Sequence, residues 1–137
     1  MAKNVAVGVL RPHNYFFYEI DCKKGEFRIL RKRFENYAKI YLKKYCIFRT
    51  KHGYHLIGKL KKENSQNFVF NKFSYWFPSD YTKELKPRFH RKNPQILRLS
   101  EKFSLQTGRV TSPKPKFICG NFQPEFQTKD KVLYYAK

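Results

Sequence analysis

The chain has 137 residues, with 30 lysines and arginines against 10 aspartates and glutamates, which gives a formal net charge of +20 with neutral histidines. This length fits one domain of ordinary size, and we expect no second large domain. Hydrophobic residues make up 41% of the chain and aromatic residues 18%, which excludes a disordered basic tail and predicts an aromatic core.

Two β-strands are expected first. Residues Val5 to Leu10 alternate branched and small side chains, and Pro12 then closes that strand. The run from Tyr15 to Cys22 also has a strand pattern, and its apolar side chains share one face: Phe16, Tyr18 and Ile20. Glu19 and Asp21 therefore share the other face.

An amphipathic helix is expected after a turn at residues 23–25. Aromatic and aliphatic residues recur there at the three- and four-residue spacing of a helix: Phe34, Tyr37, Ala38, Tyr41, Leu42 and Tyr45. Basic residues occupy the opposite face: Arg33, Lys39, Lys43 and Lys44. The pattern predicts a helix with one buried face and one solvated, cationic face.

A β-hairpin and a second helix follow. The hairpin runs from Cys46 to Thr50 and from Tyr54 to Leu60, and Gly53 supplies the backbone freedom that its turn needs. The polar residues 64–67 offer helix N-caps, and the aromatic run after them predicts a short helix that ends at Pro78.

The rest of the chain reads as a basic loop, a strand and an arm. Five of the ten residues from Lys83 to Lys92 are basic, and a strand from Gln95 to Ser100 follows. Residues 111–127 contain three prolines and predict an extended segment. We therefore expect an α+β core at 1–110, with helices on one face of a mainly antiparallel sheet, and an arm at 111–137 that packs on it.

Cellular setting and partner follow from cysteines, hydropathy and charge. No apolar run is long enough for a membrane span or a secretory signal, and three widely spaced cysteines do not form a disulfide framework. These features predict a cytoplasmic protein without a membrane partner. A surplus of twenty positive charges opposes compaction unless a polyanion neutralises it, so nucleic acid is the expected partner.

Glu19 and Asp21 are two of only ten acidic residues, and they occupy alternate positions of one strand. Their side chains are then roughly 7 Å apart on one face. Hard oxygen ligands on a rigid strand suit Mg²⁺ or Mn²⁺, above all a cation that also holds nucleotide phosphates. The alternative is that both carboxylates pair with nearby lysines and arginines and only raise local solubility.

The hairpin carries a histidine among cations. Strand alternation predicts that His55 and Lys59 share one face of the second strand, and that Arg49 and Lys51 share a face on the first. A phosphate would find these cations and an imidazole on one sheet surface. The alternative for His55 is a hydrogen-bonded histidine on a solvated hairpin.

The order of these motifs resembles the catalytic core of archaeo-eukaryotic primases and primase-polymerases. The resemblance rests on the strand that ends in Glu19-Ile20-Asp21, the helix after it, and the hairpin with Arg-Thr-Lys-His-Gly-Tyr-His at 49–55. It implies an RRM-like fold, metal ligation by Glu19 and Asp21, contact of His55 with the phosphates of a nucleoside triphosphate, and a single strand or primer–template as partner.

The resemblance covers about residues 15–100 and has two departures. Glu19 stands where an aspartate is more usual, and the strand expected to hold a third carboxylate carries Arg98, with Glu101 just beyond it and Asp80 well before it. A minimal or degenerate member, of the kind that small viruses or plasmids carry for DNA replication in the host cytoplasm, fits this pattern, and a protein partner in replication could supply the missing acid.

A non-catalytic single-strand-binding module is the alternative function. Rings interleaved with cations, at residues 72–76 and 88–92, could stack bases and neutralise phosphates. The cations expected on the phosphate-binding surface are Arg49, Lys51, Lys59, Arg88, Arg91, Lys92 and Arg98.

Two further readings need other ligands. A rolling-circle-type nickase would use a tyrosine such as Tyr41 or Tyr81 with metal-binding histidines, but two residues separate His52 from His55 where that class has one. A zinc site would need Cys46 and both of these histidines together with Cys22 or Cys119.

Overall fold

The computed structural model describes residues 3–21, 24–74 and 90–136, without the side chains of residues 24, 26, 29, 30 and 90–92. This part of the chain is a mixed α+β structure with two α-helices and two antiparallel sheets. The elements in chain order are β1 (Asn4–Leu10), β2 (Tyr15–Asp21), α1 (Lys24–Tyr41), β3 (Leu42–Arg49), β4 (Gly53–Leu60), α2 (Gln66–Ser74), β5 (His90–Lys92), β6 (Ile96–Arg98), β7 (Lys102–Ser104), β8 (Val110–Ser112), β9 (Lys116–Gly120), a 3-10 helix η2 (Thr128–Asp130) and β10 (Lys131–Ala136).

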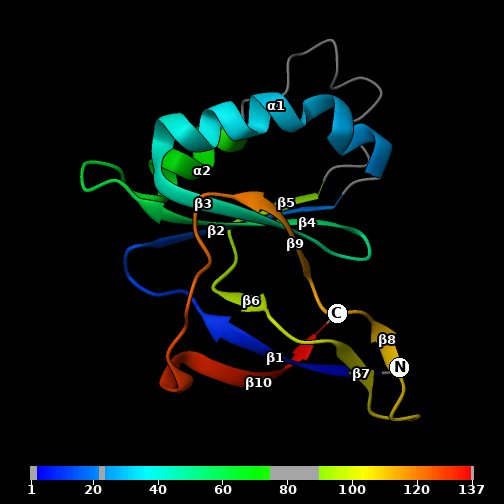
Figure 1. Ribbon diagram of the computed structural model, residues 1–137. Helices are drawn as coiled ribbons and strands as arrows, with labels where there is room; N and C mark the ends of the chain where they lie inside the picture. The colour runs from blue at the N-terminus through cyan, green and yellow to red at the C-terminus, as the bar shows by residue number, and fades with distance from the viewer. Residues whose placement is uncertain (1–2, 22–23, 75–89, 137) are drawn as a thin grey trace.

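One sheet, called here the helix-bearing sheet, has the strand order β5-β2-β4-β3-β9 with antiparallel neighbours. Along the chain, β2 is followed by α1, β3, β4, α2 and β5, and both helices lie on the same face of this sheet (Figure 1). This is the split β-α-β order of RRM-like folds, with β2 and β4 in the centre. The predicted α+β class, with helices on one face of an antiparallel sheet, is confirmed.

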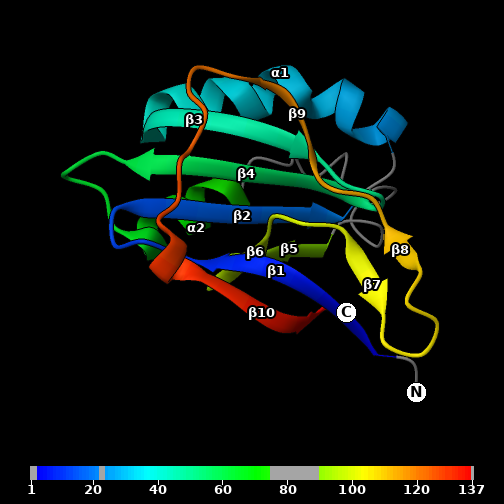
Figure 2. The same cartoon turned by 60° about the horizontal axis from the view of Figure 1, so that its bottom comes forward.

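A second sheet lies against the opposite face of the helix-bearing sheet (Figures 1 and 2). Its strand order is β10-β1-β7-β8, and β6 pairs with β1 beside this path. β10 runs antiparallel to β1 from the pair Asn4–Ala136 to the pair Val9–Lys131. The prediction of one sheet was therefore incomplete, and the missing layer comes from pairings between segments far apart in the chain.

Aromatic rings fill the layer between the helices and their sheet. The ring of Phe73 on α2 lies 5.1 Å from that of Phe34 on α1, and 5.4 and 5.6 Å from those of Tyr18 and Phe16 on β2. All four side chains are buried, and each contributes roughly 1.5–3 kcal/mol by leaving water. The predicted shared face of Phe16, Tyr18 and Ile20 is the face toward these helices.

A smaller apolar cluster lies on the other face of the helix-bearing sheet and joins it to the second sheet. Its buried members are Val9, Tyr15, Phe17, Cys46, Ile57 and Leu97. Because this cluster contains residues of β1 and β6 as well as β2, β3 and β4, it fixes the second sheet over the strands that carry Glu19 and His55.

The first helix is longer at its start and shorter at its end than the sequence pattern predicts. α1 begins at Lys24, inside the expected turn, and ends at Tyr41. Leu42 and Tyr45 belong instead to β3, where Leu42 pairs with Leu60 and packs against Gly58 of β4. Pairing with β4 thus overrides a helical spacing that continues through residues 42–45.

The hairpin and the start of α2 lie where the local sequence patterns predict them. β3 and β4 form the expected antiparallel hairpin, and the Ser65 hydroxyl accepts a hydrogen bond from the Phe68 backbone N–H as an N-cap of α2. The end of α2 that was expected near Pro78 and most of the basic loop at 83–92 lie outside the described residues. Residues 90–92 form β5 at one edge of the helix-bearing sheet.

The segment from residue 111 onward supplies an edge strand to each sheet. β9 pairs with β3 of the helix-bearing sheet, and β10 pairs with β1 of the second sheet. The two strands are linked by an extended stretch in which the Phe126 ring contacts the rings of Tyr15 and Phe17. The expected extended arm thus contributes strands to both sheets, with extended chain between them.

Candidate functional site

Glu19 and Asp21 lie on the face of β2 that is turned away from the helices. In the sheet register Glu19 is directly opposite His55 of β4, and Asp21 is opposite Gly53. The Glu19 Oε1 atom lies 3.5 Å from the His55 Nε2 atom. The three residues that carry the resemblance to primases therefore meet at one place.

A cavity of about 430 Å³ lies over this face, between the two sheets, and we call it the carboxylate cavity. β2, the β3–β4 turn and β4 line it from one side, and β6, β7, β8 and β10 from the other. Its polar lining residues are Glu19, Asp21, Thr50, Lys51, His52, His55, Arg98, Lys102, Ser112, Tyr134 and Tyr135.

Two cations of the second sheet face the carboxylates. Burial lowers the pKa of Arg98, and the nearby Tyr134 and Glu19 oppose that shift. Burial and then Arg98 lower the pKa of Lys102, while Glu19 and Asp21 raise it. Arg98 is only 6% exposed, and its Nη1 atom donates to the carbonyls of Ser100 and Pro113 at 2.6 and 3.0 Å, so its guanidinium is held in place.

His55 is a neutral imidazole at physiological pH. Burial lowers its pKa to about 3, and Arg98 and Lys102 add to that shift. This effect dominates over the 3.5 Å contact with Glu19, which would favour a charged imidazole. The Nδ1 atom of His55 is buried and has no hydrogen-bond partner in the described part of the chain.

The formal charge of the carboxylate cavity decides which ligand suits it. Lys51, Arg98 and Lys102 carry three positive charges and Glu19 and Asp21 two negative ones, which gives 3 − 2 = +1 with neutral histidines. A bare dication is therefore disfavoured. A phosphate group, or a cation that arrives already bound to several phosphates, complements this lining.

The other predicted phosphate-binding residues are spread over three places. Lys51 lies both in the carboxylate cavity and, with Arg49, in an adjoining cavity of about 390 Å³. Lys59 lies four residues from His55 on β4, roughly 13 Å away along the strand, and its ammonium group sits over the Tyr15 ring. It does not join the group around Glu19.

The remaining basic positions are only partly described. Lys92 and Arg91 of β5 are register partners of Glu19 and Ile20, so the backbone of β5 borders the carboxylate strand. Arg88 lies outside the described residues, as does Asp80, one of the two positions named for a third acid. The other, Glu101, lines a different cavity from Glu19 and Asp21.

Sequence reasoning missed Lys102, Ser112 and Tyr134. Each comes from the second sheet and reaches the carboxylate cavity only because β1 pairs with β7 and β10 and β7 pairs with β8. No local pattern marks these residues. Lys102 and Ser112 are basic and hydroxyl residues of the kind that bind phosphate, but the sequence does not show that they lie near Glu19 and Asp21.

The zinc-site and nickase hypotheses, which need histidine or cysteine ligands for a metal, find less support. Cys46 is buried in the apolar cluster, and burial raises the pKa of its thiol to about 12. Across the described ranges, no group of three or more histidine, cysteine or acidic side chains could hold a metal ion by itself. His52 is exposed in the hairpin turn, at the mouth of the carboxylate cavity, and Tyr41 ends α1 on the helical face.

Comparisons with known proteins add nothing to the resemblance to primases, which therefore rests on these residues alone. No protein-family model, curated protein or solved structure matches the chain. Neither α1 nor α2, the helices in the part of the chain that is described, is both long and apolar enough to span a bilayer. What the structure adds is an RRM-like sheet whose two central strands bring Glu19, Asp21 and His55 to one cavity.

Proposed function

We propose that the protein binds nucleic acid and holds the triphosphate of a nucleotide in the carboxylate cavity, for metal-dependent nucleotidyl transfer of the kind that primase-polymerases perform. The observation that carries this proposal is the meeting of Glu19, Asp21 and His55 opposite Arg98 and Lys102. Replication of a virus or plasmid, in the cytoplasm and with a partner protein, is the setting we propose. The free thiols of Cys46 and Cys119 agree with a reducing compartment.

The carboxylates fit a cation that comes with its nucleotide. Mg²⁺ is commonly held by one or two carboxylates together with substrate phosphates and water, and Glu19 and Asp21 supply such a pair. When bound, Mg²⁺ or Mn²⁺ neutralises phosphate charge and polarises the reacting phosphoryl group. Arg98, Lys102 and Lys51 neutralise the remaining phosphate charge. The neutral imidazole of His55 contacts the Glu19 carboxylate and helps to position it.

Nucleotide incorporation tests the catalytic part. Wild-type protein with Mn²⁺ is expected to extend a primed template, and the double variant Glu19→Gln/Asp21→Asn is expected to lose at least about 100-fold in rate, because both metal ligands become neutral amides. Primed and unprimed templates of DNA and of RNA are compared by gel electrophoresis of labelled products.

Glu63→Gln is the matched control, since it removes an exposed carboxylate from the loop before α2. A double variant as active as the wild type would refute the assignment of Glu19 and Asp21. Manganese bound by the wild type only when nucleotide is present would further support the pairing of metal and phosphate in one cavity.

A non-catalytic single-strand-binding module is the second candidate function. The observation that favours it is that Arg98 and Lys102 already lie close enough to Glu19 and Asp21 to neutralise them without a metal. The carboxylates would then hold the cations in place for a phosphate backbone. Template binding without incorporation by the wild type would select this module over the transferase.

Both candidates predict binding that weakens with salt. With a net charge of +20, three or more phosphate contacts are expected, and affinity for a single-stranded oligonucleotide should then fall more than about tenfold between 50 and 200 mM salt. Fluorescence anisotropy of a labelled oligonucleotide measures this slope. An affinity that hardly changes over this range would mean that phosphate neutralisation does not drive binding.

A further inference from the structure

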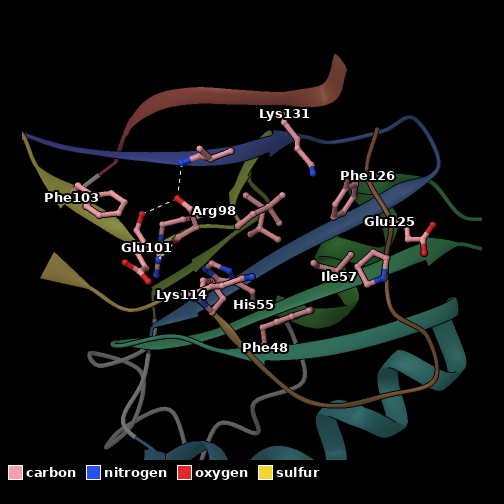
Figure 3. Close-up of a pocket in the computed structure, with 16 residues that line it drawn as sticks. Phe48, His55, Ile57, Arg98, Glu101, Phe103, Lys114, Glu125, Phe126 and Lys131 are labelled. Carbon is pink, nitrogen blue, oxygen red and sulfur yellow. Dashed lines mark hydrogen bonds between the residues drawn. The ribbon is translucent and has the colours of Figure 1, made fainter. Parts of the chain in front are cut away.

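A second and larger cavity adjoins the carboxylate cavity. It has a volume of about 840 Å³, and we call it the aromatic cavity (Figure 3). Phe48 and Ile57 rise into it from the helix-bearing sheet, and Phe126 of the extended stretch closes one end. Its size and its mainly apolar lining with a few polar groups are those of small-molecule sites.

The two cavities share a wall. His55 and Arg98 line both of them, and they are the two residues that stand between Glu19 on one side and Ile57 on the other. Of these two, Arg98 is 6% and His55 8% exposed, and the Nδ1 atom of His55 is buried without a hydrogen-bond partner in the described structure. A ligand long enough to pass His55 and Arg98 would reach the apolar lining and the cationic lining at once.

The aromatic cavity also offers polar groups at its margin. Lys114 and Lys131 bring positive charge, while Glu101 and Glu125 bring acceptors, all from elements of the C-terminal half. Figure 3 shows the rings of Phe48 and Phe126 on one side of His55 and that of Phe103, with Glu101, on the other. Flat rings with a polar margin suit a flat, polar-edged heterocycle better than an aliphatic chain.

We infer that the aromatic cavity receives the nucleobase of a nucleotide whose phosphates occupy the carboxylate cavity, with the sugar passing His55 and Arg98. The inference rests on the proposed function and adds to it that the protein itself holds the base. The apolar floor excludes water from the base, and the cations of the adjoining cavity fix the other end of the same ligand.

Calorimetric titration with three probes tests the inference. The probes are ATP, inorganic tripolyphosphate and adenosine, the first two with equimolar Mg²⁺. ATP is expected to bind at least about tenfold more tightly than tripolyphosphate, because stacking of its base adds to the phosphate contacts. Phe126→Ala is expected to remove most of that difference and to change tripolyphosphate affinity less than about twofold.

Two further variants make the result independent of folding defects. Phe126 also packs on Tyr15 and Phe17, so Val7→Trp provides a second test: Val7 lines the cavity but is 37% exposed, and the larger ring can fill the space from outside. Phe68→Ala is the control, since it removes a ring that is 44% exposed on α2. It should leave all three affinities unchanged.

The outcomes separate the inference from the proposed function. Equal affinities for ATP and tripolyphosphate would overturn the nucleobase site and leave the phosphate site standing. Binding of ATP and adenosine that Val7→Trp abolishes, without any binding of tripolyphosphate, would support the nucleobase site and overturn the triphosphate part of the proposed function. If none of the probes binds, the nucleobase site and the triphosphate part of the proposed function are both wrong.

Discussion

Replacing Gly53 with alanine is expected to lower the free energy of unfolding by about 3 kcal/mol or more. A Cβ atom at this position would lie 1.8 Å from the backbone carbonyl oxygen of Ile20 on β2. That oxygen is part of the sheet, so β2 and β4 must separate at this end to make room. The effect is measured by urea unfolding followed by circular dichroism.

Gly25→Ala is the matched control. Gly25 lies in the first turn of α1, and nothing is within 4 Å of the position where its Cβ would be. Alanine there is expected to be neutral or stabilising by up to about 1 kcal/mol, because glycine is the weaker helix former. If Gly53→Ala were as stable as Gly25→Ala, the close approach of β2 and β4 at Gly53 would be wrong.

Acid is expected to destabilise the protein through His55. The unfolded chain binds a proton at this imidazole below about pH 6.5, whereas burial, Arg98 and Lys102 keep it neutral in the folded state until its pKa of about 3. The unfolded state therefore binds more protons between these values. The free energy of unfolding should fall as the pH drops through this window, by up to about 1.4 kcal/mol per pH unit from this residue.

The experiment on acid unfolding must account for the other charged groups that face His55. Glu19 of β2 lies 3.5 Å away, and Arg98 of β6 and Lys102 of β7 act on it from the second sheet. Unfolding is therefore measured from pH 7.5 to 4 with chelator present, for the wild type and His55→Gln. The wild type is expected to show the steeper loss, and the difference between the two curves isolates His55.

His52→Gln is the control for this series, because it removes an exposed imidazole from the same cavity. Parallel curves for the wild type and His55→Gln would contradict this prediction, because they would mean that His55 has the same pKa in the folded and unfolded states. A steeper loss in His55→Gln than in the wild type would be an equally clear contradiction.

The parts of the fold that sequence could predict are those with local signals. The β-type run of β2 and the Ser65 N-cap act over a few residues, and both elements are where the pattern predicts them. The hairpin is also where it was predicted, but the role given to Gly53 was wrong: its backbone is not left-handed, and glycine is needed there because the Ile20 carbonyl lies so close. The split β-α-β order follows from them. The start of α1 could not be predicted in this way, because residues 24–26 combine a lysine, a glycine and a glutamate before any apolar repeat begins.

The second sheet could not be predicted because its information is not local. β6, β7 and β8 have three residues each, too few to show alternation, and β1 finds β10 from the far end of the sequence. The same reason explains the candidate site. Its half on β2 and β4 was found from spacing, while Lys102 and Tyr134 depend on how the second sheet packs.

The second sheet also changes how a strand of nucleic acid could approach. In an RRM, the four-stranded sheet presents its open face, and bases stack on aromatic side chains of its central strands. Here that face of β2 and β4 lies beneath β1 and β6, and the two layers are joined by Val9, Leu97, Phe17 and Ile57. A nucleic acid that bound here could therefore not lay its bases flat across this face, and its chain would have to enter from the side, end first, where the two layers part.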